Sequence, residues 1–319
     1  MKALFLGKNH SQGLKETDSS SLTGAAKALS WVIVESLSDS PDLVICVDYQ
    51  KSDLVTIRLA RKMGIPTCLI INEPKVVVPE HGQQSRLDEF DRILKIGRVD
   101  SLPVLNWPQT WRELTPRGER LNSVVIVNAD KWSFIEGQLY WLRAAAARHI
   151  VPLDIFGHGW NRSVWIRMAH RAFEMIRTLH LGHLPNVTGI RYVLSKPKSF
   201  MGQMNDKIAE MSKYKVALVI ENSQELITEK LFDAWFAGCI PVYVGPQLAP
   251  FGIPESLVVR AEPNLLSVRS SAALALQMDH TSYIEKLREF LEAPHALEWN
   301  APKALEKILR ESTKASIAK

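Results

Sequence analysis

Short, continuously apolar segments alternate with amphipathic stretches along most of the chain. The apolar segments of the first part cover residues 3–6, 43–47, 68–71 and 93–96. The segment from Leu43 to Val47 has no polar alternation, which is typical of a parallel strand covered on both faces. Patterns typical of helices cover residues 25–37 and 55–63. Because strands and helices alternate, the sequence predicts an α/β domain.

A change of character between Asn106 and Leu121 divides the chain. This stretch holds two prolines, a glycine, two tryptophans and mixed charge, so we interpret it as a linker between domains 1–119 and 120–319. Further apolar segments cover residues 124–127, 153–156, 216–220, 240–244 and 257–259. Helical patterns cover residues 134–147, 162–179, 229–237, 266–278, 281–291 and 302–312. The sequence therefore predicts two doubly wound, Rossmann-like α/β domains facing a cleft, with ligands bound at the carboxyl ends of the strands.

Composition limits the class of protein. Of the 319 residues 46% are hydrophobic and 23% are charged, which excludes a disordered chain. No apolar run approaches the roughly 18 residues of a membrane span. The first residues, Met1 to Gly7, indicate a strand rather than a signal peptide. Three cysteines in apolar segments indicate buried, reduced thiols, so we expect a cytoplasmic protein.

Charge narrows the expected partners. The formal net charge is +5, which suits an anionic ligand, a nucleic acid or an anionic membrane surface. However, lysines and arginines are scattered and form no block of like charge. We therefore expect no nucleic-acid partner and at most peripheral contact with a membrane, such as the bacterial inner membrane. The oligomeric state is left open.

The stretch from Tyr214 to Pro246 has the pattern strand, polar loop, helix, strand. Thr228 is a good helix N-cap, and Gly238 is suited to the position just after the helix. A helix N-terminus with Lys230 in its first turn can bind a diphosphate, and Glu229 can accept hydrogen bonds from ribose hydroxyls. The alternative is that Glu229 only favours the helix dipole and that Lys230 is a solvated surface residue.

The same stretch resembles the donor-binding domain of the α-1,3/4-fucosyltransferases, glycosyltransferase family 10. The resemblance rests on Tyr214-Lys215, Glu221-Asn222-Ser223, Ile227-Thr228-Glu229-Lys230 and Gly238-Cys239-Ile240-Pro241-Val242-Tyr243, in order and spacing. It is specific over roughly residues 207–245 and thins outside them. It implies a GT-B architecture, GDP-fucose or a related nucleotide sugar as donor, and inverting transfer to a glycan hydroxyl. By the resemblance, Glu229 holds the ribose and Lys230 the diphosphate, and the donor site also includes Glu221, Asn222, Ser223 and Thr228.

A carboxylate in the first domain is the candidate catalytic base. Glu73 follows the apolar segment 68–71 at a predicted strand end, and Pro74 turns the chain out of the sheet. The family has a Glu followed by Ser-Pro there, acting as general base on the acceptor hydroxyl, whereas this sequence has no intervening Ser. The alternative is that Glu73 caps the following loop.

Two cations are candidates for a further phosphate contact. The family carries an Arg in the helix after the first strand of the donor domain, but Glu136 stands near that position here. Lys131, in the preceding loop, and Arg143, on the predicted helix, are the replacements we consider. For each of them, the alternative to a phosphate contact is an ordinary surface position.

Weaker candidates line the acceptor side. His10, Asp48 and Tyr49 follow predicted strands of the first domain, where they either line an acceptor pocket or serve as ordinary loop residues. No Asp-x-Asp motif occurs, and such carboxylates hold the Mg²⁺ or Mn²⁺ of metal-dependent sugar transferases. We therefore expect no metal ligands and no cofactor, since Lys230 and the helix terminus can neutralise the leaving diphosphate.

Taken together, these features predict an inverting α-1,3-fucosyltransferase-like enzyme of lipopolysaccharide or capsule synthesis. Its partners would be a nucleotide sugar and a glycan acceptor. Two alternatives stay open: a relative with another nucleotide-sugar donor, and a non-catalytic nucleotide-sugar-binding protein.

Overall fold

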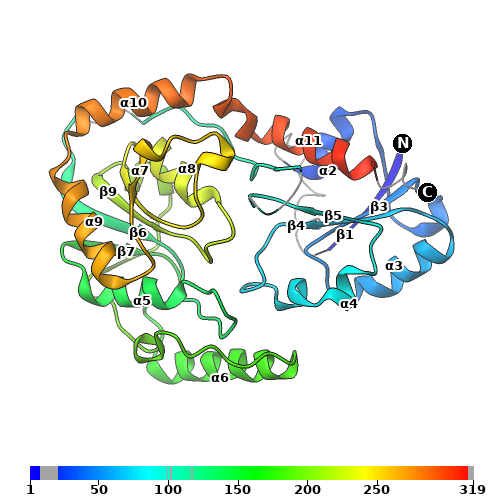
Figure 1. Ribbon diagram of the computed structural model, residues 1–319, viewed down its shortest axis with the longest axis horizontal. Coiled ribbons are helices and arrows are strands. Elements are labelled where there is room, and N and C mark those ends of the chain that lie inside the picture. Colours follow the sequence, from blue (N-terminus) through cyan, green and yellow to red (C-terminus); the bar gives the residue numbers. More distant parts are fainter. Residues whose placement is uncertain (8–20, 99, 101–102, 116–117, 315–319) are drawn as a thin grey trace. The chain divides into compact units, whose positions relative to one another are not determined.

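The computed structural model describes residues 1–7, 21–98, 100, 103–115 and 118–314. The chain forms two compact units (Figure 1). Unit 1 comprises Met1–Trp111 and Pro294–Lys319, and unit 2 comprises Arg112–Ala293. The predicted division at residues 119 and 120 is therefore corrected: the boundary lies earlier, and the end of the chain belongs to unit 1.

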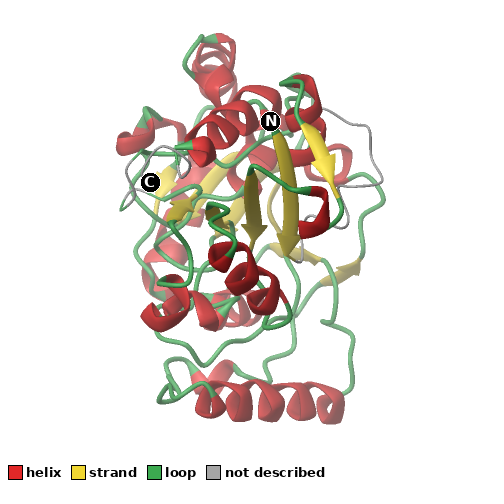
Figure 2. Cartoon of the chain, turned by 90° about the vertical axis from the view of Figure 1, so that its right-hand side faces the viewer, coloured by secondary structure: helices red, strands yellow, loops and turns green. Residues whose placement is uncertain are grey.

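Unit 1 is built on a parallel five-stranded sheet of order β2-β1-β3-β4-β5. Its strands are β1 (Lys2–Gly7), β2 (Val32–Val34), β3 (Leu43–Val47), β4 (Thr67–Ile71) and β5 (Arg92–Lys95). Its helices are α2 (Leu22–Ala28), α3 (Asp53–Lys62), α4 (Gln84–Leu87) and α11 (Ala301–Thr313), with the short 3₁₀ helices η1 (Leu37–Asp39), η2 (Pro79–Gly82) and η6 (Ala296–Trp299). The strands of this sheet can be seen in yellow in Figure 2.

Two separate apolar clusters cover the faces of this sheet. One joins the strands to α2 and α11 and includes Ala26, Leu305, Ile308 and Leu309. The other joins the strands to α3 through residues such as Ile57. The return of α11 explains the corrected domain boundary, because its apolar side chains complete the core of unit 1 rather than that of unit 2.

The helix predicted over residues 25–37 is wrong in its second half. The helix α2 ends at Ala28, and Ser30 adopts a left-handed conformation with φ of 59°. The β-branched residues that follow form β2, which pairs with β1. Strand pairing therefore overrides the amphipathic pattern here.

Unit 2 is built on a parallel six-stranded sheet of order β11-β10-β9-β6-β7-β8. Its strands are β6 (Leu121–Val127), β7 (Leu153–Phe156), β8 (Phe200–Gly202), β9 (Tyr214–Ile220), β10 (Ile240–Val244) and β11 (Val259–Arg260). Its helices are α5 (Tyr140–His149), α6 (Val164–His180), α7 (Lys207–Met211), α8 (Glu229–Phe236), α9 (Leu265–Gln277) and α10 (His280–Glu292), with the 3₁₀ helices η3 (Ile190–Tyr192), η4 (Ala249–Phe251) and η5 (Glu255–Leu257).

Helices cover both faces of this second sheet. In Figure 1, α7 and α8 lie on one side of β6 and β9, while α5 and α9 lie together on the other. The predicted helix 134–147 begins later than expected, because Gly137 has a φ of 88° and Gln138 pairs with Ser223 before α5 starts. The prediction of two Rossmann-like α/β domains is confirmed.

Two further expectations concern burial. All three cysteines are buried and free, as predicted. Among the described residues, no helix combines the length and the apolar character needed to cross a bilayer.

Candidate active site

The topology of unit 2 places its candidate site beside β6 and β9. Strands β7 and β8 continue the sheet on the β6 side of this pair, whereas β10 and β11 continue it on the β9 side. The strand order reverses between them, and open α/β sheets bind ligands outside the carboxyl ends of strands at such a switch point. The residues that leave β6 are Asn128 to Lys131, and those that leave β9 are Glu221 to Ser223.

The N-terminus of α8 is held in place by a buried carboxylate. Glu221 is fully buried, and its carboxylate accepts hydrogen bonds from the Thr228 amide at 2.9 Å and the Thr228 hydroxyl at 2.7 Å. The Thr228 hydroxyl also accepts a hydrogen bond from the Lys230 amide at 3.4 Å. Thr228 is therefore the N-cap of α8, as predicted, and Gly238 follows the helix with a φ of 68°.

Lys230 lies directly beside this helix terminus. Its ammonium group donates to the Thr228 hydroxyl at 2.8 Å and lies 3.5 Å from the Glu221 carboxylate. Its side chain is mostly buried. Because the hydrogen-bonded carboxylate and hydroxyl fix the ammonium, a positive charge stands next to the amides of the first helical turn, an arrangement that suits a phosphate group.

Glu229 is the more exposed residue of the same turn. Its side chain is 45% exposed, and its carboxylate lies 3.8 Å from the Lys230 ammonium. Burial acts to raise the pKa of this carboxyl, but the charges of Lys230, Lys207 and Arg143 outweigh it and lower the pKa. A solvent-accessible, ionised carboxylate at this point can accept hydrogen bonds from two neighbouring hydroxyl groups, as a ribose presents.

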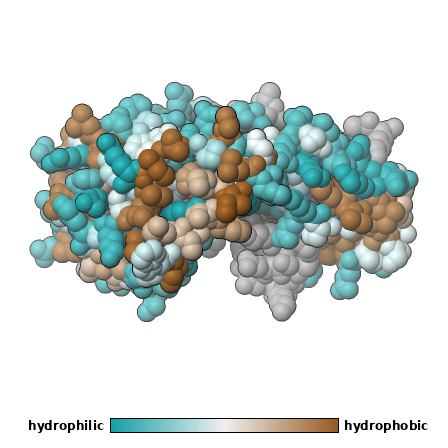
Figure 3. All heavy atoms as spheres, turned by 90° about the horizontal axis from the view of Figure 1, so that it is seen from below, coloured by the Kyte–Doolittle hydropathy of each residue, from teal (hydrophilic) through white to brown (hydrophobic). Residues whose placement is uncertain are grey.

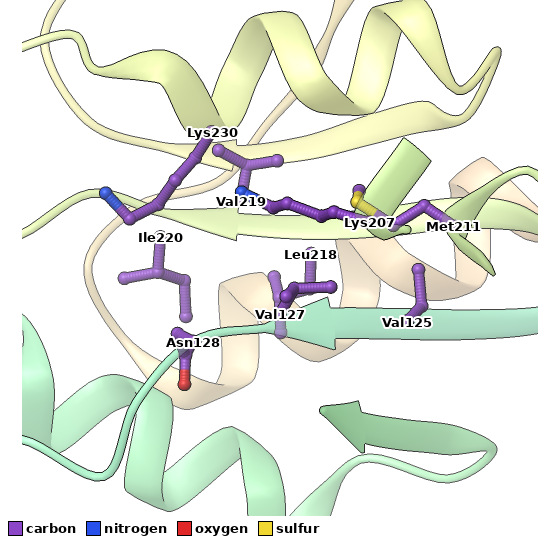
Figure 4. A pocket seen from close by; sticks show the side chains of 9 residues that line it. All are labelled: Val125, Val127, Asn128, Lys207, Met211, Leu218, Val219, Ile220 and Lys230. Carbon is purple, nitrogen blue, oxygen red and sulfur yellow. The ribbon is translucent and has the colours of Figure 1, made fainter. Parts of the chain in front are cut away.

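A narrow recess lies between the carboxyl halves of β6 and β9 (Figure 4). Lys207 and Lys230 both line it, together with Asn128 and apolar strand residues. The Asn128 side-chain oxygen is buried and has no hydrogen-bond partner among the described residues. Lys207 is paired with Asp233 on α8. Two ammonium groups therefore line this recess at the switch point, while the Asn128 oxygen points away from them (Figure 4).

Arg143 is buried and binds neighbouring backbone and side-chain oxygens, so its guanidinium is not accessible to solvent. Its guanidinium donates to the Ile220 carbonyl at 3.0 Å and to the Asn222 side-chain oxygen at 2.9 Å. Burial lowers its pKa, opposed by the carboxylates of Glu221 and Glu229. Arg143 thus fixes the end of β9. Of the two cations considered for a further phosphate contact, only Lys131 is exposed.

Asn222 and Ser223 belong to the same fixed loop. Asn222 receives the Arg143 hydrogen bond on its side chain and the Leu139 amide on its carbonyl. The Ser223 hydroxyl is buried and accepts from the Glu225 amide at 3.3 Å. Of the predicted donor-site residues, the structure therefore gathers Glu229 and Lys230 at the accessible helix terminus, while Glu221, Ser223, Thr228 and Arg143 form its buried support.

Sequence reasoning missed a second buried charge cluster next to Lys131. The Asp130 carboxylate pairs with Arg167 at 2.6 Å and with Arg171 at 2.5 Å, and all three side chains are buried. Arg167 also donates to the carbonyls of Leu194 and Ser195. This cluster ties the loop after β6 to helix α6. The available signal was the spacing of four between Arg167 and Arg171, which places both on one face of a helix.

A tight packing contact fixes the neighbouring strand end. Gly157 follows β7 with a φ of 132°, and a Cβ there would lie 2.1 Å from the Asn128 carbonyl oxygen. The same carbonyl accepts a hydrogen bond from the Trp160 indole at 2.9 Å. Glycine is therefore required at position 157 for the chain leaving β7 to approach the chain leaving β6.

In unit 1, Glu73 follows β4 and lies on an anchored loop. Its amide, like that of Asn72, donates to the Asp48 carboxylate. Its carbonyl accepts from His81 at 2.9 Å and from Arg98 at 3.0 Å. The residue is half-buried. Its backbone is thus fixed from three sides at the carboxyl end of the sheet, where the sequence predicted it.

Of the weaker acceptor-side candidates, Asp48 and Tyr49 follow β3 as expected, but their side chains are buried. The Asp48 carboxylate is buried and holds the backbone of the Glu73 loop. Tyr49 lies in the core between His81 and Phe90, and burial raises the pKa of its hydroxyl to about 12. His10 lies outside the described residues. Neither Asp48 nor Tyr49 presents its side chain to a ligand here, because both are buried among neighbouring residues.

The described part of the chain holds no group of His, Cys, Asp or Glu side chains suited to a metal ion. The acidic residues of the site are instead engaged by amides, hydroxyls and cations.

Comparisons with known proteins agree with the fold. The structure is similar to that of an α1,3-fucosyltransferase, with a TM-score of 0.55 and 14% identity over 100% of this chain and 90% of that one. It is equally similar to HepE from Anabaena in complex with UDP and glucose, with a TM-score of 0.55 and 12% identity over 98% of this chain and all of that one. This chain has the GT-B fold.

A third similar structure is an α,α-trehalose 6-phosphate synthase from Burkholderia multivorans. The TM-score is 0.52 and the identity 10%, over 93% of this chain and 75% of that one. No family model matches the sequence, and no curated protein matches it. At these identities the likeness concerns the fold.

Proposed function

We propose that this protein is a glycosyltransferase that moves a sugar from a nucleotide-sugar donor to a glycan hydroxyl. The observation that carries the proposal is the N-terminus of α8, where Lys230 and Glu229 stand at the switch point of the unit 2 sheet. The GT-B fold supports the proposal, since the similar structures include a fucosyltransferase and a protein in complex with UDP and glucose. In this proposal Lys230 and the helix terminus bind the diphosphate, and Glu229 binds the ribose.

The donor we propose is GDP-fucose. The support is the order and spacing of Glu221-Asn222-Ser223, Thr228-Glu229-Lys230 and Gly238 to Tyr243, which resemble the fucosyltransferase signature. A UDP-sugar is the second candidate, because the structure is as similar to HepE as to the fucosyltransferase.

The chemistry of the proposed reaction places two demands on the protein. The acceptor hydroxyl must lose a proton, and the departing diphosphate must be stabilised as its charge grows. Glu73 is the proposed base, since the backbone of this half-buried residue is anchored directly after a strand end. Lys230, the amides of α8 and Lys131 are the proposed partners of the diphosphate, so transfer would need no metal ion.

A thermal-shift screen of the full chain against GDP, UDP and CMP, with their sugar conjugates, tests the proposal. GDP and GDP-fucose are expected to raise the melting temperature, and the other nucleotides to leave it unchanged. A response to UDP alone would replace the donor assignment, and no response to any nucleotide would refute the function. Sugar transfer that is abolished by EDTA and restored by Mn²⁺ would contradict the metal-independent mechanism.

A further inference from the structure

Helix α6 buries only polar residues and exposes most of its large apolar residues. Its buried residues are Arg167, Arg171 and Thr178. The two arginines pair with Asp130, and the Thr178 hydroxyl donates to the Glu174 carbonyl. Ordinary surface helices of globular proteins bury an apolar stripe and expose charge. The helix is therefore attached to unit 2 by a buried ionic cluster, and its apolar stripe is left outside.

The exposed face of α6 is broad. Trp165 is 75% exposed, Phe173 is 61% exposed and Ile176 is 64% exposed. At about 100° per residue, the apolar positions cover roughly 200° of the helix circumference, opposite the buried arginines. Further exposed apolar side chains on and after this helix are Val164, Ile166, Met168, Met175, Leu179, Leu184, Val187 and Ile190.

These exposed apolar side chains all belong to residues 164–190 of unit 2. Figure 3 views the molecule from below relative to Figure 1, the side of unit 2 on which α6 lies, and apolar atoms gather there next to hydrophilic ones. An apolar patch of this extent, with a polar border, marks an interaction surface.

The charge around the patch selects the partner. Residues 157–202 contain seven lysines and arginines but one acidic residue, Glu174, and therefore carry a net charge of +6. The whole chain carries +5, so the remainder is nearly neutral. Two of these cations neutralise Asp130 inside the unit, while Arg162, Arg191, Lys196 and Lys198 are exposed. The basic character of the protein is thus concentrated on the segment that exposes its apolar helix.

We infer that α6 docks unit 2 onto an anionic lipid bilayer. Trp165, Phe173 and Ile176 enter the interface between headgroups and acyl chains, and the surrounding cations pair with lipid phosphates. A helix with a large apolar face, an aromatic residue at its edge and a basic border lies in the plane of such an interface. A second copy of the chain fits less well, because it would bring the same excess of positive charge to the same contact.

The buried cluster gives this docking a mechanical role. Asp130 lies in the loop after β6 and is paired with two arginines of α6. A lipid-bound α6 therefore fixes the orientation of the carboxyl end of the unit 2 sheet relative to the bilayer. Membrane docking through α6 does not depend on which nucleotide the site binds. A negative result for docking can therefore be distinguished from a negative result for the proposed function.

Flotation of the full chain with lipid vesicles tests the inference. Wild-type protein is expected to bind vesicles of phosphatidylglycerol and phosphatidylethanolamine at least about tenfold more tightly than vesicles of phosphatidylcholine, with weaker binding at high salt. The triple variant W165S/F173S/I176S is expected to lose at least about tenfold of this affinity. The variant K196Q/K198Q is expected to lose affinity for anionic vesicles alone.

Matched controls keep the result interpretable. The variant L266S/L274S removes two comparably exposed apolar side chains from α9 of the same unit, at 75% and 56% exposure, and should bind vesicles like wild type. Far-ultraviolet circular dichroism and the melting temperature should be unchanged in all variants. Equal binding by the α6 triple variant, or no preference for anionic lipid, would overturn the inference. So would a concentration-dependent dimer that the triple variant abolishes, combined with no vesicle binding.

Discussion

Neighbouring side chains hold in place the ammonium of Lys230, the proposed contact of the diphosphate. Its ammonium is fixed by the Thr228 hydroxyl and the buried Glu221 carboxylate, so little side-chain entropy remains to be lost on binding a phosphate. The Glu221 carboxylate also accepts two hydrogen bonds from Thr228. The carboxylate therefore holds the cation in place.

Replacing Lys230 by Gln should weaken binding of the nucleoside diphosphate by about 10- to 100-fold, because a charged hydrogen bond to phosphate is lost. Isothermal titration calorimetry of the full chain measures this affinity. Lys213, which pairs with Glu210 next to α7, provides the control variant K213Q, which should bind like wild type. Equal affinity of K230Q and K213Q would remove Lys230 from the diphosphate site.

Glu73 is the residue on which the proposed chemistry depends. Replacing Glu73 by Gln keeps the shape of the side chain and its anchored backbone but removes the base, so sugar transfer should fall by about 10²- to 10⁴-fold. Nucleotide affinity should stay within twofold of wild type, about the error of such a titration. A single-turnover transfer assay provides the rate. A variant that keeps a tenth or more of the wild-type rate would exclude Glu73 as the base.

His81 makes the Glu73 loop sensitive to acid. Burial lowers the pKa of its imidazole to about 4, although the Asp48 carboxylate lies 3.7 Å away; that carboxylate is already engaged by the Asn72 and Glu73 amides. In the unfolded chain His81 therefore binds a proton near pH 6.5, whereas in the folded chain it stays neutral until the pH approaches 4. Stability present above pH 6.5 is lost progressively as pH falls toward 4.

Between pH 7 and pH 5 this loss should reach about 2 kcal/mol for the elements around β4. Hydrogen exchange of β3 and β4 peptides, followed by mass spectrometry, measures it within unit 1. In the variant H81N, whose amide can donate to the Glu73 carbonyl, the same peptides should lose less stability over this interval. Identical pH profiles for the two proteins would assign the acid sensitivity to other groups.

At the scale of elements, α8 is the best-specified part of the chain. Its cap, its first turn and its closing glycine were all predicted from Thr228, Lys230 and Gly238, because capping is a local property that sequence records. The helix predicted over 25–37 failed for the opposite reason. Pairing of Val32 to Val34 with β1 is a contact across the sheet, and the local pattern contains no sign of it.

Thr228 joins the cap of α8 to the buried Glu221, so its loss should be felt by the whole element. The variant T228A should lower the free energy of unfolding of unit 2 by about 2 kcal/mol, since it removes a cap and leaves Glu221 with fewer hydrogen bonds. Chemical denaturation followed by circular dichroism measures the change. The variant T228S keeps the hydroxyl and should lose less; equal losses would indicate that the methyl group, not the cap, matters.

The candidate site could be predicted in part for a related physical reason. Thr228, Glu229 and Lys230 are adjacent in sequence, so their grouping was visible before folding. The cluster of Asp130 with Arg167 and Arg171 joins segments 37 residues apart or more, and its buried charges looked like ordinary surface residues of a helix. Tyr49 and Asp48 were placed at the correct strand end, but the sequence did not indicate that their side chains turn inward.

At the scale of the whole molecule, the end of the chain belongs to the unit that contains its beginning. Helix α11 buries Leu305, Ile308 and Leu309 against the first sheet, and Arg92 on β5 pairs with Glu311 at 2.9 Å. The hydrophobic pattern predicted the helix, but an amphipathic pattern does not indicate which sheet the apolar face packs against. That assignment needed the long-range contacts of the folded chain.

A chain that stops at Ala293 should therefore lose the fold of unit 1. Removing the three large apolar side chains of α11 withdraws about 5 kcal/mol or more of burial from that core. Limited proteolysis should cleave residues 1–111 rapidly while sparing 112–293, and nucleotide binding should persist. A chain shortened only to residue 314, with α11 intact, is the control. Equal protease resistance of both truncated chains would show that α11 is dispensable.

The return of α11 also sets an order of events during synthesis. Domains usually fold in the order in which they leave the ribosome, but unit 1 needs α11, which is made after all of unit 2. The continuous segment 112–293 emerges earlier and complete. During translation the later-encoded sheet can thus mature first, while the apolar face of the first sheet that α11 covers stays exposed until α11 has left the ribosome.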